Sequence, residues 1–545
     1  MKNSGMESGM FIDSDEDMEK DLHKDENDGN DSDYSNYSNE NNSMRKPSSY
    51  SMAWPQSYRQ SIDLYGSVPS PNIGFLGTTS LSRLGSSFIS SSLTRRQTLE
   101  ILQQEKKPLL QPTEEEKVHH TLLPSQVSRK SSIRKDPSKV SHEVHIPGQC
   151  TFGQAVLNGI NALCGIGILS TAYAVKEGGW VSLSILLLYA LFSFYTGLLL
   201  RYCLDSAPGL ETYPDIGQAA FGTTGRIIIS IILYMELYAC CIEYIIVESD
   251  NLSTLFPNAH ISLGGIEVNA HILFAILTAV ALLPTVWLRD LRILSYVSAC
   301  GVIATFLVVI CLIWVCFVDK AAIDYTKGTT TTSTFNLATF PVAIGLYGYC
   351  YAGHAVFPNL YTAMGNRNQF PGVLLVCFVI CTTMYCAVAV MGYSAFGEAT
   401  LSQFTLNLPQ HLVAAKIAVW TTVVNPFTKY ALSLSPVAMC LEELIPPNNP
   451  NFNIYSKLIR TALVISTLLV GLSVPFFGLV MSLTGSLLTM FVSLILPAAC
   501  FLSIRGRRTS RFQVVLCVTI ILVGLASCCF GSYSALSEIM EKLFG

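Results

Sequence analysis

The sequence has little charge. Asp, Glu, Lys and Arg make up 13% of its 545 residues, whereas an ordinary soluble domain carries about 25%. Hydrophobic residues make up 50%. A chain of this length with so few charges could not cover the surface of several soluble domains, which excludes a cytosolic enzyme. The net charge of −4 also argues against a nucleic-acid-binding protein, because such proteins carry a basic excess.

The N-terminal part lacks the long hydrophobic runs of the remainder. Residues 1–40 carry 13 acidic side chains against three lysines, residues 43–98 are rich in serine, and residues 129–139 are basic. Apolar residues do not recur with a sustained period here, so the segment cannot bury enough surface to offset its ordering entropy. The chain also opens without the hydrophobic region of a secretory signal peptide. We therefore predict a disordered tail over 1–150 and a membrane domain over 151–545.

The remainder consists of apolar runs of about 20 residues or more, long enough to cross about 30 Å of hydrocarbon. Because a lipid-embedded backbone must satisfy its own hydrogen bonds, these runs predict helices. The sequence has no ten-residue alternating segments of the kind that indicate membrane strands. We predict an all-α integral membrane protein with eleven transmembrane helices, at 152–175, 178–200, 226–250, 269–288, 291–318, 337–360, 371–396, 411–440, 455–474, 477–504 and 512–535.

Lys and Arg residues near the span ends predict the orientation. If the tail is cytosolic, the cytosolic loops hold eleven such residues, among them Arg201, Arg226 and Arg505, and the opposite side holds four. This bias favours eleven spans, a cytosolic N-terminus and a C-terminus on the opposite side.

The first span contains two glycines near its middle, Gly165 and Gly167, and two asparagines, Asn158 and Asn161. The glycines weaken a helix, and the asparagines lie on one helical face. One interpretation is a break in the helix that forms a binding site lined by both asparagines. The alternative is a close helix crossing, because small residues favour such contacts in membranes.

The sixth span repeats this pattern. Residues 341–358 contain three glycines, three tyrosines, His354 and a proline at each end. Glycine-interrupted segments at matching places in two halves indicate an inverted-repeat transporter. The N-terminal end of a half-helix presents free amides to an anion, and unwound carbonyls can hold a cation. The two ends together suit a zwitterion such as an amino acid.

The third span contains Glu236, Glu243 and Glu248. The first two are seven residues apart and so lie on one face. A charged carboxylate in hydrocarbon costs about 2.5–3.5 kcal/mol on insertion scales, so these side chains should face the bundle interior. We interpret Glu236 and Glu243 as candidate proton-coupling residues. A structural pair or a hydrogen-bond anchor is the alternative.

Two further polar residues lie inside predicted spans. Lys429 of the eighth span follows Pro426, which frees a backbone carbonyl. Lys429 could neutralise a glutamate of the third span or occupy the place of a sodium ion. His354 is a candidate proton carrier, because histidine ordinarily titrates near neutrality. A packed histidine that bonds an unwound carbonyl is the alternative.

The tail contains one candidate sorting motif. Glu105, Leu109 and Leu110 fit the acidic dileucine pattern, which clathrin adaptors bind on cytosolic tails to route membrane proteins to endosomes, vacuoles or lysosomes. The motif is short and arises by chance, but its place in a predicted cytosolic tail favours it.

Cysteine is absent before position 150, and the 17 cysteines from Cys150 onward lie mostly inside the predicted spans. The sequence has no CxxC pair. We therefore expect neither a disulfide frame nor a metal site. Cysteine in a membrane helix acts mainly as a small apolar residue.

Four stretches resemble the amino acid/auxin permease superfamily: NALCGIGIL at 161–169, ELYACCIEYIIVESDNL at 236–252, YCYAGHAVFP at 349–358 and NPFTKYAL at 425–432. The resemblance covers about 151–545. The branch most resembled is that of the plant vacuolar amino acid transporters, which are similar to vesicular inhibitory amino acid transporters. The long acidic, serine-rich tail also suits this branch.

The resemblance implies a five-plus-five inverted repeat with broken first and sixth helices, followed by an eleventh helix. It implies secondary active transport of amino acids, driven by a proton gradient and without a cofactor. In the family the substrate lies between the two broken helices. Carried over to this chain, the substrate carboxylate would be held by the amides of Gly165, Ile166 and Gly167. The amino group would be held by the carbonyls of Leu163 and Gly345. The pocket for the side chain would be shaped by Tyr347 and Tyr349. Lys429 stands where sodium-coupled relatives need hydroxyl ligands, which argues against sodium dependence.

The leading hypothesis is a proton-coupled carrier of neutral amino acids across the vacuolar membrane, with the plasma membrane or another endomembrane as alternatives. An antiporter would load an acidic vacuole and a symporter would empty it, and the residues are compatible with both. The expected partners are an amino acid, the lipid bilayer and a clathrin adaptor, with no nucleic acid. The rival hypothesis is a receptor that binds amino acids without moving them and signals through its tail. An enzyme is least expected, because the sequence offers no paired His and Asp at one membrane face.

Overall fold

The computed structural model describes Pro55, Tyr58 and residues 150–263, 266–287, 291–318, 331–446 and 449–545. The sorting motif predicted at Glu105, Leu109 and Leu110 lies outside these residues, and the division of the chain at residue 150 stays a prediction. Two residues of the predicted tail, Pro55 and Tyr58, are buried.

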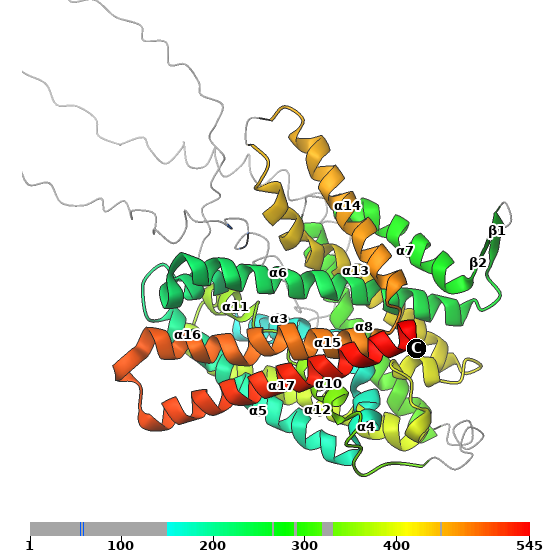
Figure 1. Ribbon diagram of the computed structural model, residues 1–545, viewed down its shortest axis with the longest axis horizontal. Helices are drawn as coiled ribbons and strands as arrows, with labels where there is room; N and C mark the ends of the chain where they lie inside the picture. Colours follow the sequence, from blue (N-terminus) through cyan, green and yellow to red (C-terminus); the bar gives the residue numbers. More distant parts are fainter. Residues whose placement is uncertain are drawn as a thin grey trace, which may run out of the picture. The chain divides into compact units, whose positions relative to one another are not determined.

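The described residues form a helical protein (Figure 1). The first six α-helices in the membrane domain are α3 (Phe152–Leu163), α4 (Thr171–Gly178), α5 (Leu183–Leu204), α6 (Tyr213–Leu255), α7 (Ala270–Trp287) and α8 (Leu291–Val318). They are followed by α10 (Phe340–Tyr349), α11 (Phe357–Ala363), α12 (Phe370–Phe396), α13 (Val413–Glu442), α14 (Phe452–Ser473), α15 (Phe477–Thr484), α16 (Leu496–Arg505) and α17 (Arg511–Phe544). A short antiparallel hairpin of β1 (Ile261–Leu263) and β2 (Ile266–Val268) lies between α6 and α7.

Many of these helices have the length and composition of membrane spans. Within the described part of the chain, seven helices are long and apolar enough to cross a membrane, and the count is eight if one bent pair forms a single span. The predicted spans at 291–318 and 411–440 coincide with α8 and α13, and the span at 337–360 coincides with α10 and α11. The structure is thus that of a protein with many spans, while the number eleven and the inverted-repeat arrangement stay predictions.

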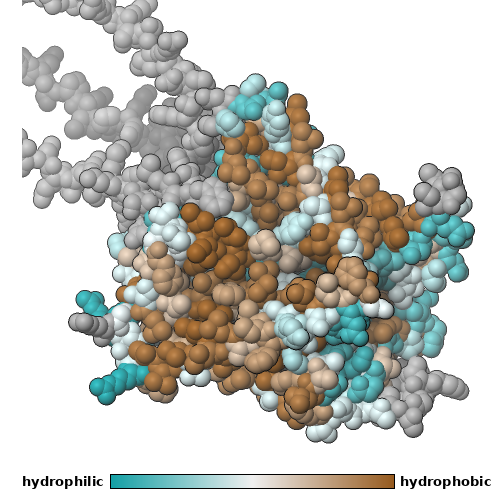
Figure 2. Space-filling view, viewed as in Figure 1, coloured by the Kyte–Doolittle hydropathy of each residue, from teal (hydrophilic) through white to brown (hydrophobic). Residues whose placement is uncertain are grey.

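The outward faces of the helices are apolar. Leu191 of α5, Ile303 of α8 and Phe530 of α17 are all more than half exposed. Figure 2 shows a nearly continuous hydrophobic surface over the region of α15, α16 and α17. A soluble monomer rarely exposes an apolar patch larger than a few hundred Å², so this surface suits a lipid environment.

The first predicted span is interrupted. Its two halves, Phe152–Leu163 and Ile166–Gly178, meet at an angle of 50°. Cys164 and Gly165 between them have non-helical backbone angles, and the second half begins with a 3₁₀ turn over Ile166–Ser170. We call Cys164 and Gly165 the first break.

The sixth predicted span is interrupted as well. It consists of α10 and α11, separated by residues 350–356, which we call the second break. A proline lies in the first turn of each helix, where its missing N–H leaves no intrahelical bond unmade. The second half of the span therefore begins at Phe357, with Pro358 in its first turn.

Helix α6 begins before the predicted third span, because it includes an additional helical segment on the N-terminal side of a kink. Gly222 has a φ of 69° inside it, a conformation that glycine adopts without strain. Across the kink, Arg226 Nη1 donates to Asp215 Oδ1 at 2.6 Å, and Arg226 is 4% exposed. The predicted span at 226–250 is the part of α6 that follows this kink.

The two breaks lie inside a shell of long helices. Helix α10 packs against α4, α15 and α17, helix α12 packs against α3 and α4, and helix α13 packs against α6 and α8. In Figure 1, α6 and the run from α15 to α16 lie side by side. Between α15 and α16 the helix passes through two π-helical turns, a distortion that is frequent at functional sites.

Candidate functional site

The first break frees backbone carbonyls, and a buried lysine bonds two of them. Lys429 Nζ donates to Cys164 O at 2.9 Å and to Asn161 O at 3.3 Å. The lysine comes from α13 and is 2% exposed. The C-terminal end of a helix carries partial negative charge, so an ammonium group is stabilised there. Lys429 thus bonds two carbonyls at the end of α3, and the two roles suggested for it, neutralising a glutamate or taking the place of a sodium ion, stay predictions.

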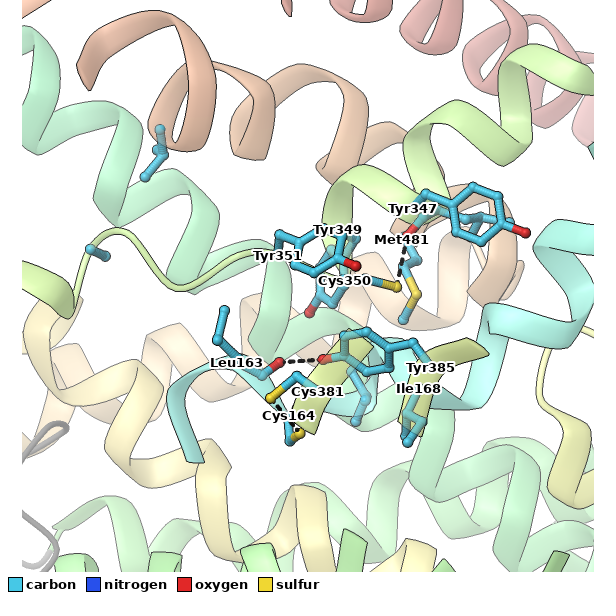
Figure 3. Close-up of a cluster of buried hydrophobic side chains, with 14 of the residues drawn as sticks. Leu163, Cys164, Ile168, Tyr347, Tyr349, Cys350, Tyr351, Cys381, Tyr385 and Met481 are labelled. Carbon is cyan, nitrogen blue, oxygen red and sulfur yellow. Dashed lines mark hydrogen bonds between the residues drawn. The ribbon is translucent and has the colours of Figure 1, made fainter. Parts of the chain in front are cut away.

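A tyrosine from α12 bonds the third freed carbonyl. Tyr385 donates its hydroxyl to Leu163 O at 2.6 Å, and Gly165 N donates to the same oxygen at 3.0 Å. Beside it, the thiols of Cys164 and Cys381 lie 3.3 Å apart. Figure 3 shows these groups converging on the break from α3 and α12. The Leu163 carbonyl predicted to hold an amino group is thus bonded by the chain itself in this conformation.

The other side of the first break presents backbone amides. Ile166 and Gly167 open the 3₁₀ turn, so their N–H groups have no acceptor within it. Asn158 and Asn161 are buried on α3, at 5% and 2% exposure. The Asn158 amide oxygen has no hydrogen-bond partner among the described residues.

A small cavity borders Gly165 and Ile166. Its water-accessible volume is about 10 Å³, close to what one water molecule needs, so an amino acid enters only when the helices move. One buried lining group, Asn425 Oδ1, has no hydrogen-bond partner in the described part of the chain. All nine lining residues are uncharged: Gly165, Ile166, Ile168, Leu169, Thr305, Val308, Thr422, Asn425 and Pro426.

The predicted residues of α10 have different surroundings. Gly345 lies where α10 approaches α15 most closely, and an added Cβ would collide with Ser482. Tyr347 makes a hydrogen bond with Ser182 at 3.2 Å. Gly345 thus lies at a close helix contact of the kind that small residues allow, and its carbonyl lies against Gly485, the first residue of the π-helical turn after α15.

Tyr349 links the first break to α6. A Cβ added at Gly167 would lie 3.2 Å from the Tyr349 ring, and the Tyr349 hydroxyl lies 3.2 Å from the Cys240 thiol. In Figure 3 the Tyr347 ring points away from Leu163 and Cys164. Of the two predicted pocket tyrosines, Tyr349 is thus the one beside the 3₁₀ turn that follows the first break.

The glutamates of α6 are buried in different environments. Glu236 accepts a hydrogen bond from Thr489 Oγ1 at 2.8 Å. Glu243 is completely buried, and neither of its carboxyl oxygens has a hydrogen-bond partner within the described ranges. Tyr349 and Thr484 are among its polar neighbours. Glu243 is therefore the less compensated of the two buried acids.

His354 lies in the second break and bonds α5. Its Nε2 is 3.0 Å from Thr196 Oγ1 and 3.1 Å from Ser193 O, and its ring contacts Phe357 with centroids 4.8 Å apart. The side chain is fully buried. The carbonyl that His354 bonds belongs to helix α5 and is not an unwound one, and both roles suggested for His354 stay predictions.

Two residues of this site were not predicted as site residues from the sequence. Tyr385 lies in an apolar span, where nothing distinguishes it from other tyrosines. Asn425 had a signal, because it precedes Pro426 in the motif NPFTKYAL. A wider opening of about 760 Å³ lies at the far end of α10, beside Glu538 and Lys542 of α17, and contains none of the predicted site residues.

The sequence is similar to a family of known proteins. Residues 148–537 match the family described as transmembrane amino acid transporter protein. The chain is 62% identical to amino acid transporter AVT1C of Arabidopsis thaliana, over 98% of each protein. It is 60% identical to amino acid transporter AVT1B of the same plant, over the whole of both. It is also 27% identical to the vesicular GABA transporter of Caenorhabditis elegans, over 72% of this chain and 80% of that protein.

Proposed function

The chain belongs to the family of transmembrane amino acid transporter proteins, and we propose that it is a proton-coupled secondary transporter of neutral amino acids in the vacuolar membrane. The observation that carries this proposal is the bond network of Lys429 at the first break. The ammonium donates to two carbonyls that the break frees. A site with its own fixed cation has no need of a sodium ion at those carbonyls, so the driving ion is a proton.

Glu243 is the group best suited to carry that proton. It lies on α6 beside Tyr349, which contacts Gly167. A charged carboxylate in hydrocarbon costs about 2.5–3.5 kcal/mol on insertion scales, and the nearby Tyr349 and Thr484 side chains make no bond of full hydrogen-bond geometry to Glu243 that would offset this cost. We infer that Glu243 is protonated in this closed conformation and releases its proton when the helices open to water.

The cavity beside the first break supports a neutral zwitterion as substrate. The free amides of Ile166 and Gly167 would hold the carboxylate, and Asn425 Oδ1 would accept from the ammonium. The substrate side chain would then lie among the uncharged residues that line the cavity. A charged side chain would meet no partner there, and burying it would cost several kcal/mol.

The vacuolar location has support from the resemblance to plant vacuolar transporters and from the distribution of Lys and Arg. With the N-terminus in the cytosol, Glu105, Leu109 and Leu110 would be accessible to clathrin adaptors. A fluorescent fusion should then mark the vacuolar membrane, and Leu109→Ala with Leu110→Ala should redirect it. An unchanged location in the double variant would remove the motif from the proposal.

The transport proposal is tested with the full-length protein in proteoliposomes. Uptake of labelled alanine, glutamine, lysine and glutamate is measured under a pH gradient of either direction, in sodium and in choline buffers. We expect uptake of the neutral amino acids under one direction of the gradient, equal rates in both buffers, and loss of uptake with a protonophore. Uptake that needs sodium, or that is indifferent to the gradient, would overturn proton coupling.

A further inference from the structure

One aromatic residue of the predicted tail is buried inside the membrane domain. Tyr58 is 1% exposed. Its hydroxyl donates to Ala355 O at 3.4 Å, across 297 positions of the sequence. Its ring meets the Tyr234 ring of α6 edge to face, with centroids 5.9 Å apart. Tyr58 therefore bridges α6 and the second break.

A second contact holds the same stretch of the tail three residues earlier. Arg226 Nη2 donates to Pro55 O at 3.3 Å. The same guanidinium donates through Nη1 to Asp215 Oδ1 at 2.6 Å and to Gln218 Oε1 at 3.1 Å. Because these bonds fix the arginine, the Pro55 carbonyl meets a donor that is already oriented.

The position of Tyr58 relates it to the proposed transport machinery. Burial raises the pKa of the Tyr58 phenol well above its ordinary value, and the carboxylates of Glu236 and Asp215 raise it further. The Tyr234 ring that Tyr58 contacts lies two positions before Glu236 in α6. The Arg226 side chain that bonds Pro55 O also bonds Asp215 across the kink.

A residue in this place opposes movement. Transport in a protein with broken helices requires them to shift against the surrounding bundle. Tyr58 bonds the second break on one side and packs against α6 on the other. Both contacts must be lost before the second break can separate from α6 at this point.

We propose that Pro55 and Tyr58 act as an autoinhibitory plug, in which the Tyr58 side chain lies between α6 and the second break and slows the transport cycle. This inference rests on the proposed transport function. Release of the plug, by substitution of Tyr58 or by a factor that binds the tail, raises the rate without changing any residue of the first break.

The first test measures uptake by full-length variants in proteoliposomes, normalised to the amount of protein. Tyr58→Ala removes the ring and should raise the initial rate about threefold or more, since docked molecules no longer withhold transport-competent protein. Tyr58→Phe keeps the ring packed on Tyr234 and should stay within about twofold of wild type, because it loses only one long hydrogen bond. Tyr34→Ala, which changes another tyrosine of the predicted tail, should have no effect. Equal rates in Tyr58→Ala and wild type would overturn the plug.

The second test does not depend on transport. A labelled peptide of residues 48–65 is titrated onto the full-length Tyr58→Ala protein in detergent, beside the same peptide carrying Ala in place of Tyr58. We expect saturable binding of the first peptide only, and weaker binding to wild-type protein, whose own tail competes. Equal binding of both peptides would overturn the docking site. Tyr58-dependent binding in the absence of any uptake would overturn the transport function while supporting the docking site.

Discussion

The two breaks differ in how their backbone groups are bonded. At the first break, side chains from distant helices bond the freed carbonyls, and one of them, Lys429, ordinarily carries a full charge. At the second break, most bonds are local turns, such as those from Tyr351 N to Gly348 O and from Val356 N to Gly353 O.

Among the described residues, the side chains that bond backbone carbonyls of the second break from elsewhere are neutral hydroxyls. Ser493 donates to Tyr351 O at 3.3 Å, and Tyr58 donates to Ala355 O at 3.4 Å. The difference suggests a division of labour. The first break is held by a charge, so it is the place where ion and substrate can be coupled. The second break is held by weaker and replaceable contacts, so it is the place where movement can be controlled.

The largest effect, and the strongest test of the difference between the two breaks, is expected from removing the positive charge at the first break. Lys429→Ala leaves the carbonyls of Asn161 and Cys164 buried without their donor, which costs about 1–3 kcal/mol per group. We expect uptake to fall more than about 100-fold, measured in proteoliposomes at equal protein. Lys416→Ala, which changes an exposed lysine of the same helix, is the matched control and should transport normally. Uptake within threefold of wild type in Lys429→Ala would contradict a role for the charge.

The next largest effect is expected from filling the gap between the breaks. A Cβ at Gly167 would press on the Tyr349 ring at 3.2 Å, whereas a Cβ at Gly165 meets nothing within 4 Å. Overpacking of this kind costs about 1–3 kcal/mol, so Gly167→Leu should lower uptake about 30-fold. Gly165→Ala should stay close to wild type. Initial rates at several substrate concentrations provide the measurement, and the result would count against the site if the two variants behaved alike.

A smaller effect separates the two buried acids. Glu243→Gln mimics the protonated carboxyl, so it should abolish the response to a pH gradient while leaving exchange of amino acid across the membrane. We expect gradient-driven uptake to fall about tenfold, as for loss of one group that moves a proton, and exchange to change by less than about threefold. Glu236 keeps a hydrogen-bond partner in Thr489, so Glu236→Gln should affect coupling less. Gradient-driven uptake at the wild-type rate in Glu243→Gln would assign the proton to another group.

Much of the fold was predictable because its signals are local. Runs of about 20 apolar residues mark spans wherever they occur, and the helices follow them. Both breaks were also predictable, since Gly165 and the glycines of 345–353 weaken a helix regardless of its neighbours. The family resemblance carried by the four motifs is confirmed by the match over 148–537.

The remaining features depend on contacts between distant positions. Lys429 was recognisable as a candidate because a lysine in mid-span is energetically costly. The sequence of its own helix does not predict that the Cys164 carbonyl is its hydrogen-bond acceptor. Tyr385 reaches Leu163 across 222 positions, and Tyr58 lies in a stretch whose composition predicts disorder. Periodicity and composition report what a segment can do alone. They do not report which donor a freed carbonyl will meet after the helices pack.

The smallest effect on uptake is expected from removing one tyrosine hydroxyl group at each break. Tyr385→Phe removes a donor from Leu163 O, which keeps its bond from Gly165 N, so the loss should be about 0.5–1.5 kcal/mol and about three- to fivefold in uptake. Tyr351→Phe is the matched control. The Tyr351 hydroxyl lies 3.0 Å from the hydroxyl of Thr382, which belongs to α12 like Tyr385, and it bonds no freed carbonyl of the first break. We expect it to change uptake by less than about twofold, because that bond lies between side chains of α12 and the second break. If Tyr351→Phe were the more damaging of the two, the second break rather than the first would control the rate of binding.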